Sequence, residues 1–181
     1  MDKYNVYQDM SRRTGGEIYL GIVGPVRTGK STFIKRFMEL VVIPEMSDDN
    51  EKVRTIDELP QSADGKTIMT TEPKFIPKEA AVIHFSNQET GKIRLIDCVG
   101  YLVPEAVGAI EEEKERMVKT PWSEEEIPFS KAAEIGTSKV IREHSNLGLI
   151  ITTDGSFGDI PAVNFEEALQ KTVMECEKAG K

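Results

Sequence analysis

The chain has 181 residues, of which 39% are hydrophobic, which suffices for one α/β domain with a sizeable core but not comfortably for two. Its net charge of -8 argues against a nucleic-acid binder, because phosphate contacts need clustered Lys and Arg. No run approaches the ~18 apolar residues of a membrane span, and the polar N-terminus lacks the apolar core of a signal peptide, so we expect a cytoplasmic protein with no transmembrane segment. Cys98 and Cys176 fit neither a disulfide framework nor a zinc site, and we expect both to be buried.

The first segment, residues 2–13, predicts a short amphipathic helix ended by Gly15-Gly16. We therefore divide the chain into an N-terminal arm, residues 1–16, and a domain, residues 17–181. The arm could bind a partner or cap the edge of a sheet. Residues 18–23 then form an apolar run typical of a buried parallel strand, and apolar residues recur at helical spacing from Phe33 until Pro44.

The junction of this strand and helix carries the pattern GxxxxGK[ST] over residues 24–31. Its glycines let successive backbone N–H groups converge on phosphates at the positive end of the helix dipole. Lys30 is expected to reach the β and γ oxygens, and the Ser31 hydroxyl to ligate Mg²⁺. The pattern predicts a nucleoside triphosphate site. The residues expected to cradle the nucleotide are Gly24, Pro25, Val26, Arg27, Thr28, Gly29, Lys30, Ser31 and Thr32, joined by Gly100 further along.

The next segment predicts a mobile loop, because residues 47–57 are acidic and irregular and residues 59–66 are rich in turn formers. The loop ends in a threonine cluster. In switch-type enzymes a threonine at this place completes the Mg²⁺ shell and senses the γ-phosphate. Thr70 and Thr71 are our candidates, with Thr67 in reserve; a polar entry to a strand is the alternative, since turns favour these residues anyway.

Two strand-like runs follow, residues 81–85 and 93–97, separated by a hairpin-type stretch that predicts antiparallel pairing. Asp97 ends the second run and begins an Asp-x-x-Gly pattern. A carboxylate at the carboxyl end of such a strand is placed to hold Mg²⁺ directly or through water, so we expect metal ligands at Ser31, Thr70 and Asp97. The Gly100 N–H can approach the γ-phosphate because no side chain blocks it.

Water activation needs a separate explanation, because Tyr101 stands where Ras-like switches place a water-orienting Gln. Arg27 lies inside the phosphate loop, in a string that resembles the loop of the large guanylate-binding GTPases. There, the loop arginine acts as an arginine finger in cis. We expect Arg27 to neutralise charge on the transferring phosphate, with a solvent-facing arginine as the alternative. The predicted catalytic residues are thus Arg27, Lys30, Thr70, Thr71 and Asp97.

The rest of the chain completes an α/β pattern. Residues 101–128 predict a long surface segment with a short charged helix in its middle. Residues 130–143 predict a helix that turns Ala133, Val140 and Ile141 inward, and residues 147–152 predict a buried strand. We expect Asn164 to cap a last helix whose apolar stripe comprises Phe165, Leu169, Val173 and Cys176, and we expect His84 and His144 to be structural.

These elements predict a doubly wound, three-layer α/β/α domain of the P-loop NTPase type, with a mostly parallel sheet, one antiparallel strand and the arrangement of the switch GTPases. We expect in-line attack by water and an almost wholly electrostatic catalysis. A kinase is disfavoured because we find no acceptor-binding lid or catalytic base. Tyr101 favours a non-hydrolysing scaffold as an alternative. A GTPase stays open, because the base-reading Asn-Lys-x-Asp would come after the last helix, where the sequence stops.

The assembled strings resemble the N-terminal portion of the stage IV sporulation protein A family, coat morphogenetic ATPases of endospore-forming bacteria. The likeness runs nearly end to end, and strings of this length are more specific than a phosphate loop alone. They are residues 13–16, 21–31, 37–42, 57–62, 66–75, 97–101, 133–137 and 150–155.

The resemblance implies a GTPase-like fold that uses ATP, hydrolysing it to drive self-assembly into a static polymer around the forespore. It places the family's Walker A lysine on Lys30, its Walker B aspartate on Asp97 and its sensor threonines on Thr70 and Thr71. It also implies a location in the mother-cell cytoplasm at the outer forespore surface. Members are longer, and their further regions contact other copies, coat proteins and a small amphipathic membrane-bound peptide. We expect this chain to be the ATPase domain, truncated before the base-recognition strand.

Overall fold

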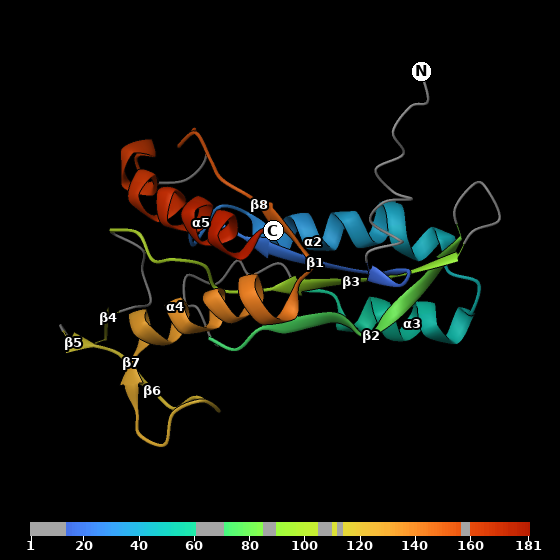
Figure 1. The fold of residues 1–181 in the computed structure, drawn as a ribbon, viewed down its shortest axis with the longest axis horizontal. Coiled ribbons are helices and arrows are strands. Elements are labelled where there is room, and N and C mark those ends of the chain that lie inside the picture. Colours follow the sequence, from blue (N-terminus) through green and yellow to red (C-terminus); the bar gives the residue numbers. More distant parts are fainter. Residues whose placement is uncertain (1–13, 61–70, 85–89, 105–109, 112–113, 157–159) are drawn as a thin grey trace.

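The computed structural model describes residues 14–60, 71–84, 90–104, 110–111, 114–156 and 160–181, in which a four-stranded sheet carries helices on both faces (Figure 1). In chain order the elements are β1 (Glu17–Val23), α2 (Lys30–Phe37), the π-helix η1 (Met38–Val42), the 3₁₀ turn η2 (Ile43–Glu45), α3 (Asp49–Glu58), β2 (Lys74–His84), β3 (Thr90–Asp97), β4 (Ile110–Glu111), β5 (Lys114–Glu115), β6 (Met117–Val118), β7 (Ile127–Pro128), α4 (Phe129–Lys139), the π-helix η3 (Val140–His144), β8 (Leu147–Ile150), the 3₁₀ turn η4 (Ala162–Phe165) and α5 (Glu166–Ala179).

The sheet has the strand order β2-β3-β1-β8. β1 pairs in parallel with β3 and with β8, whereas β2 runs antiparallel to β3. Ile22 of β1 aligns with Asp97 at the end of β3, and Val23 aligns with Ile150 at the end of β8. The loops that follow β1, β3 and β8 therefore emerge at the same edge, which is where ligands bind in open α/β sheets. The predicted mostly parallel sheet with one antiparallel strand is confirmed.

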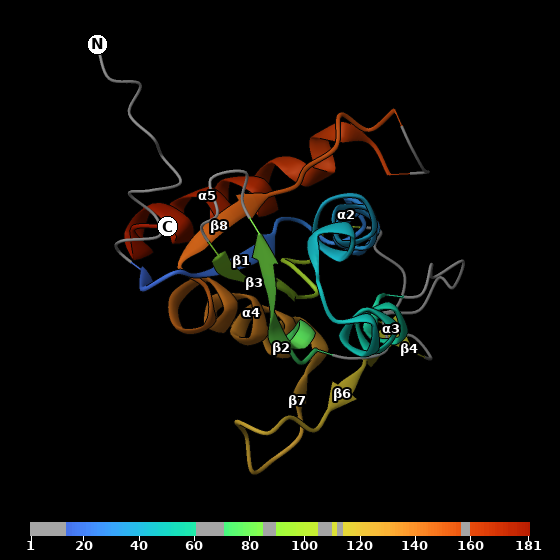
Figure 2. The same cartoon turned by 90° about the vertical axis from the view of Figure 1, so that its right-hand side faces the viewer.

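Two apolar layers hold the helices to the sheet, because alternate strand residues face opposite sides. On one side, Ile22 of β1 and Leu95 of β3 pack in one cluster with Ile34 of α2. On the other side, Val23 and Ile96 pack with residues of η3 and α5. Figure 2 shows α2 and α3 on one side of the sheet and α4 on the other. The three-layer architecture matches the prediction.

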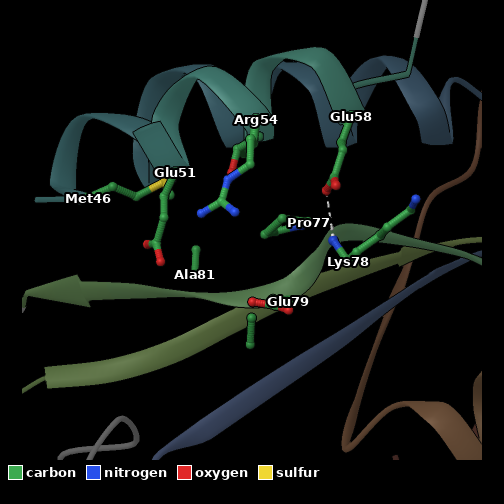
Figure 3. A pocket seen from close by; sticks show the side chains of 10 residues that line it. Met46, Glu51, Arg54, Glu58, Pro77, Lys78, Glu79 and Ala81 are labelled. Carbon is green, nitrogen blue, oxygen red and sulfur yellow. Dashed lines mark hydrogen bonds between the residues drawn. The ribbon is translucent and has the colours of Figure 1, made fainter. Parts of the chain in front are cut away.

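The bulged edge strand β2 bounds a hollow beneath α3 (Figure 3). Its pairing with β3 shifts between Ile76 and Ala81, around Pro77, which has no N–H to give to a ladder. The N–H of Lys78 instead donates to the carboxylate of Glu58 at 2.8 Å. The hollow measures about 190 Å³ and shares no lining residue with the segment between β1 and α2.

The segment before β2 differs from our expectation of an irregular loop, because residues 49–58 form α3. The Asp48 carboxylate accepts hydrogen bonds from the N–H groups of Asn50 and Glu51, which caps the helix start. Only Thr55 is buried within α3, so the helix lacks the apolar periodicity on which the sequence interpretation relied. Residues 61–70 lie outside the described part, so the predicted mobile loop there stays a prediction.

The expected short helix in residues 101–128 is also wrong for the described residues. Two small hairpins occupy this stretch, β4 with β5 and β6 with β7. Each strand has two residues, too short for an alternating pattern to be recognised in the sequence.

The last helix begins later than we expected, since Asn164 lies inside η4 and α5 starts at Glu166 with Phe165 at its N-cap. Of the predicted stripe, Phe165 and Cys176 are buried and Leu169 and Val173 are half-buried. The small residues Ala168 and Thr172, which we did not predict, are buried as well. β8 is only partly buried, because it lies at the edge of the described sheet.

Several other expectations are confirmed. Ala133, Val140 and Ile141 are buried, as are the free thiols of Cys98 and Cys176. His144 packs edge-on against Phe75, in agreement with a structural role. The predicted arm helix, residues 2–13, lies outside the described residues. Among the helices that are described, none is long and apolar enough to cross a membrane.

Candidate functional site

The loop between β1 and α2 folds tightly around its own backbone. Gly24, at φ +137°, lies against Ile151, the residue that follows β8, where an added Cβ would come within 2.1 Å of the carbonyl oxygen. Gly29 adopts the left-handed conformation at φ +88° and begins α2, with open space where a side chain would stand. Both positions require glycine for backbone reasons, the first also for close packing. The exposed N-terminus of α2 is thereby left open to a ligand.

Lys30 folds back into this loop. Its side chain is 5% exposed, and its ammonium donates to the Pro25 carbonyl oxygen at 2.6 Å. Burial lowers the pKa of Lys30, while the nearby acidic groups of Cys98 and Asp97 raise it. The Thr28 hydroxyl donates to the same carbonyl at 2.9 Å. A cation is thus held inside the loop at the place predicted for phosphate binding.

Ser31 and Asp97 meet across the gap between the two motifs. The Ser31 hydroxyl donates to Asp97 Oδ2 at 2.7 Å. Asp97 Oδ1 is buried and has no hydrogen-bond partner among the described residues. Burial raises the pKa of the Asp97 carboxyl, an effect opposed by the Ser31 hydrogen bond and the charge of Lys30. A hydroxyl beside a carboxylate with an unpaired oxygen is a donor set that fits Mg²⁺.

Gly100 lies between the phosphate loop and α4. A Cβ on Gly100 would come within 2.1 Å of the Gly24 carbonyl oxygen and 2.8 Å of Lys30 Nζ. Its φ of +92° is also one that side chains rarely permit. The Gly100 N–H donates to Thr137 Oγ1 of α4 at 3.2 Å. The predicted phosphate contact of Gly100 therefore has the required proximity, but its N–H is directed toward α4 in this structure.

Thr71 lies against the same helix. It is 5% exposed, and the Gly136 position has no room for a side chain, because a Cβ there would come within 2.4 Å of the Thr71 carbonyl oxygen. The other sensor candidates, Thr70 and Thr67, lie outside the described residues. Of the threonine cluster, Thr71 is thus the described member, and its backbone contacts α4.

Arg27 is exposed on the surface, whereas Tyr101 is buried. Arg27 is exposed on the loop and has a φ of +63°, a conformation uncommon for a residue with a side chain. Tyr101 is 4% exposed and packs with Val26 and Phe165, while its carbonyl accepts the Val26 N–H at 2.9 Å. The Tyr101 backbone therefore supports the loop, and its ring lies in an apolar cluster. Thr32 is exposed on the first turn of α2.

The structure thus brings Lys30, Ser31, Asp97 and Gly100 together. Sequence reasoning missed the Gly136 and Thr137 pair, although both residues stand in a string that carried the family resemblance. No pattern assigned a role to that string, so contacts across the fold were needed to find one.

The chain is similar to known proteins along its whole length. The family model for the ATPase domain of stage IV sporulation protein A matches residues 1–181. This chain belongs to that family. The protein named stage IV sporulation protein A of Bacillus subtilis (strain 168) is 57% identical over 181 residues, covering 100% of this chain and 37% of the relative. The protein of the same name from Clostridioides difficile (strain 630) is 50% identical over 177 residues, covering 98% of this chain and 36% of the relative.

The chain spans little more than a third of the length of these stage IV sporulation protein A relatives. The family match therefore concerns the ATPase domain, and nucleotide binding is the property that the name of this domain implies. No solved structure was found to match the chain.

Proposed function

We propose that this chain binds ATP together with Mg²⁺ and hydrolyses it to ADP and phosphate. The observation that carries the proposal is the 2.7 Å hydrogen bond between Ser31 of the loop and Asp97 of β3, beside the buried Lys30. Sixty-six residues separate the two partners, so the fold, not local sequence, joins the two halves of the motif. The strand order and this pairing support a switch-GTPase type of fold.

Each residue has a distinct task in this proposal. The Lys30 ammonium leaves the Pro25 carbonyl and binds the β and γ oxygens of the nucleotide. The Ser31 hydroxyl and the Asp97 carboxylate hold Mg²⁺, which supplies positive charge for the phosphates when it is bound. Backbone N–H groups of the loop and of the α2 N-terminus bind the remaining phosphate oxygens. Because the reaction needs little covalent chemistry from the protein, positioning and charge account for the catalysis.

Arg27 and the threonines complete the proposed machinery. Arg27 is exposed on the phosphate-binding loop, and in this proposal its side chain acts on the γ-phosphate as an arginine finger in cis. Thr70 or Thr71 completes the metal shell. For Thr71 this requires a rearrangement, because Thr71 is buried against α4 in this structure.

A second candidate function is a nucleotide-dependent scaffold with little hydrolysis. It is favoured by the position of the Tyr101 side chain, which is buried in a cluster with Val26 and Phe165 and has the Lys171 ammonium over its ring at 5.0 Å. The residue after the Asp-x-x-Gly pattern therefore does not replace the water-orienting Gln. Hydrolysis in this chain depends on Arg27 or on a group outside the described residues.

The names of the relatives support a role of the proposed activity in sporulation. We propose that hydrolysis drives self-assembly of a spore-coat layer on the outer forespore surface, in the mother-cell cytoplasm. Contacts with other copies, with coat proteins and with a small amphipathic membrane-bound peptide belong in this proposal to the longer protein.

Phosphate release from ATP and GTP in parallel tests the proposal, with Mg²⁺ or with EDTA, in the parent and in Lys30→Ala. We expect Mg²⁺-dependent release from ATP that Lys30→Ala abolishes. A preference for GTP would replace the ATPase with a GTPase. Nucleotide binding without release would support the scaffold, and absence of binding would refute both functions.

A further inference from the structure

The helix α4 contacts both segments that are predicted to meet the γ-phosphate. Gly136 packs against the backbone of Thr71, and Thr137 accepts a hydrogen bond from Gly100. The two contacts come from adjacent residues, yet they reach segments that lie before β2 and after β3. The proposed function assigns no task to Gly136 or Thr137.

Thr137 is fully buried, and its hydroxyl is committed to the end of β3. It accepts the Gly100 N–H at 3.2 Å, and it also forms a hydrogen bond that lowers the pKa of the Cys98 thiol, although burial outweighs it and raises that pKa to about 11. A buried N–H without a partner is costly, so the Thr137 hydroxyl stabilises the present direction of the Gly100 N–H. This bond spans 37 residues of sequence.

The position of Gly100 makes its N–H relevant to phosphate. If Gly100 had a Cβ atom, it would lie only 2.8 Å from Lys30 Nζ, the group proposed to bind the γ-phosphate. One N–H cannot donate fully both to Thr137 and to an oxygen held by Lys30. Because a glycine permits wide changes of backbone dihedral angles, the peptide before Gly100 is able to turn from one acceptor to the other.

Gly136 provides the second contact. A side chain at this position would come within 2.4 Å of the Thr71 carbonyl oxygen, so the absence of one lets the Thr71 segment lie directly on α4. The segment that carries a sensor threonine and the segment that carries Gly100 thus rest on consecutive residues of one helix. A shift of either segment therefore changes its contact with α4.

We propose that Gly136 and Thr137 form a positioning element that distinguishes a triphosphate from a diphosphate. Without a γ-phosphate, the Thr137 hydroxyl accepts a hydrogen bond from the Gly100 N–H. A bound γ-phosphate accepts this hydrogen bond instead, so that α4 loses its bond to Gly100. This inference rests on the proposed function. A ligand shifts a two-state equilibrium only through its differential affinity, and here the differential contact is the γ-phosphate itself.

The test compares the affinities of the intact protein for a non-hydrolysable ATP analogue and for ADP, both with Mg²⁺, by titration calorimetry. Thr137→Val removes this acceptor and leaves the Gly100 N–H with only the Cys98 sulfur, a weak acceptor, unless a γ-phosphate binds it. We expect the preference for the analogue over ADP to rise by about 2- to 12-fold, the range for a hydrogen bond of ordinary net strength. Thr137→Ser keeps the hydroxyl and should return the preference to the parent value.

Two further variants separate positioning from loss of structure. Gly136→Ala displaces Thr71, so we expect weaker binding of the analogue with ADP binding unchanged. Ser138→Ala is the matched control on α4, because its side chain bonds to Glu175 of α5 at 2.8 Å and should leave the preference unaltered. If Thr137→Val does not fold by circular dichroism, Thr137→Ala carries the same expectation.

The outcomes are distinguishable. A parent protein that binds neither nucleotide would refute the proposed function. A parent that binds both, together with a preference that is equal in Thr137→Val, Thr137→Ser and the parent, would overturn the inference and leave the proposed function standing. Equal weakening of analogue and ADP in Thr137→Val would show a purely structural role and would also overturn it.

Discussion

Replacing Asp97 by Asn should make the ligand-free protein more stable and the nucleotide-bound protein less stable. The Asp97 side chain is half-buried, its buried Oδ1 has no hydrogen-bond partner among the described residues, and desolvation raises the pKa of the carboxyl above the ordinary value of 3.8. Asn keeps the shape and still accepts from Ser31, but its second polar atom stays unpaired, so the gain comes only from removing a charge that burial disfavours. We expect about 1 kcal/mol, or about 2–4 °C in the unfolding midpoint of a domain of this size.

Binding of the ATP analogue with Mg²⁺ should make the parent more stable than Asp97→Asn. A ligand at 100 times its Kd stabilises the folded state by about 2.7 kcal/mol, a gain that the parent should receive from the ATP analogue with Mg²⁺. Asp97→Asn should lose most of it, because the proposed metal ligand is gone. Thermal unfolding with and without the analogue and Mg²⁺ measures both effects. Asp49→Asn is the control: this exposed carboxylate forms a surface ion pair with Lys52 on α3, a contact worth little, so the variant should follow the parent in both series.

The pH dependence has a definite sign. Because the folded-state pKa of Asp97 is raised, the ionised carboxylate destabilises the ligand-free fold above that pKa, and protonation relieves the cost as the pH falls toward 3.8. The stability advantage of Asp97→Asn should therefore be largest at neutral pH and shrink in acid. A ligand-free variant less stable than the parent at pH 7 would refute the reasoning about burial. An undiminished gain from the analogue would refute the metal role.

Three further predictions concern the loop. Lys30→Ala should weaken binding of the ATP analogue roughly 10- to 150-fold, the range for a lost charge-assisted hydrogen bond, and an unchanged Kd in calorimetry would contradict the phosphate role. Arg27→Ala should lower kcat by ~10³ or more at saturating ATP with little change in analogue affinity; if phosphate release is as fast as in the parent, the arginine-finger idea fails. Gly24→Ala should destabilise the fold by about 3 kcal/mol in urea unfolding, because the added Cβ would lie 2.1 Å from the Ile151 carbonyl oxygen. The Cβ of Gly29→Ala would meet open space, so this variant should cost only about 1–2 kcal/mol. Equal costs would show that the contact of Gly24 with Ile151 is unimportant.

The sequence by itself determined the parts of this protein that depend on neighbouring residues. The phosphate loop follows from the fixed spacing of Gly24, Gly29 and Lys30, and the places of β1 and β3 in the chain follow from short apolar runs, the second ended by Asp97. Each such signal is complete within about ten residues. The charged helix α3 escaped detection because it buries only Thr55 and so lacks an apolar stripe.

Tertiary structure alone decided which distant residues share the site. The parallel register of β1 with β3 places Ser31 on Asp97, and the packing of α4 under the sheet edge places Thr137 on Gly100 and Gly136 on Thr71. These contacts span tens of residues, and hydrophobic patterning specifies only which face of an element is buried, not which polar group it meets. Strand register and helix packing make that choice, because they fix distances to within the length of a hydrogen bond.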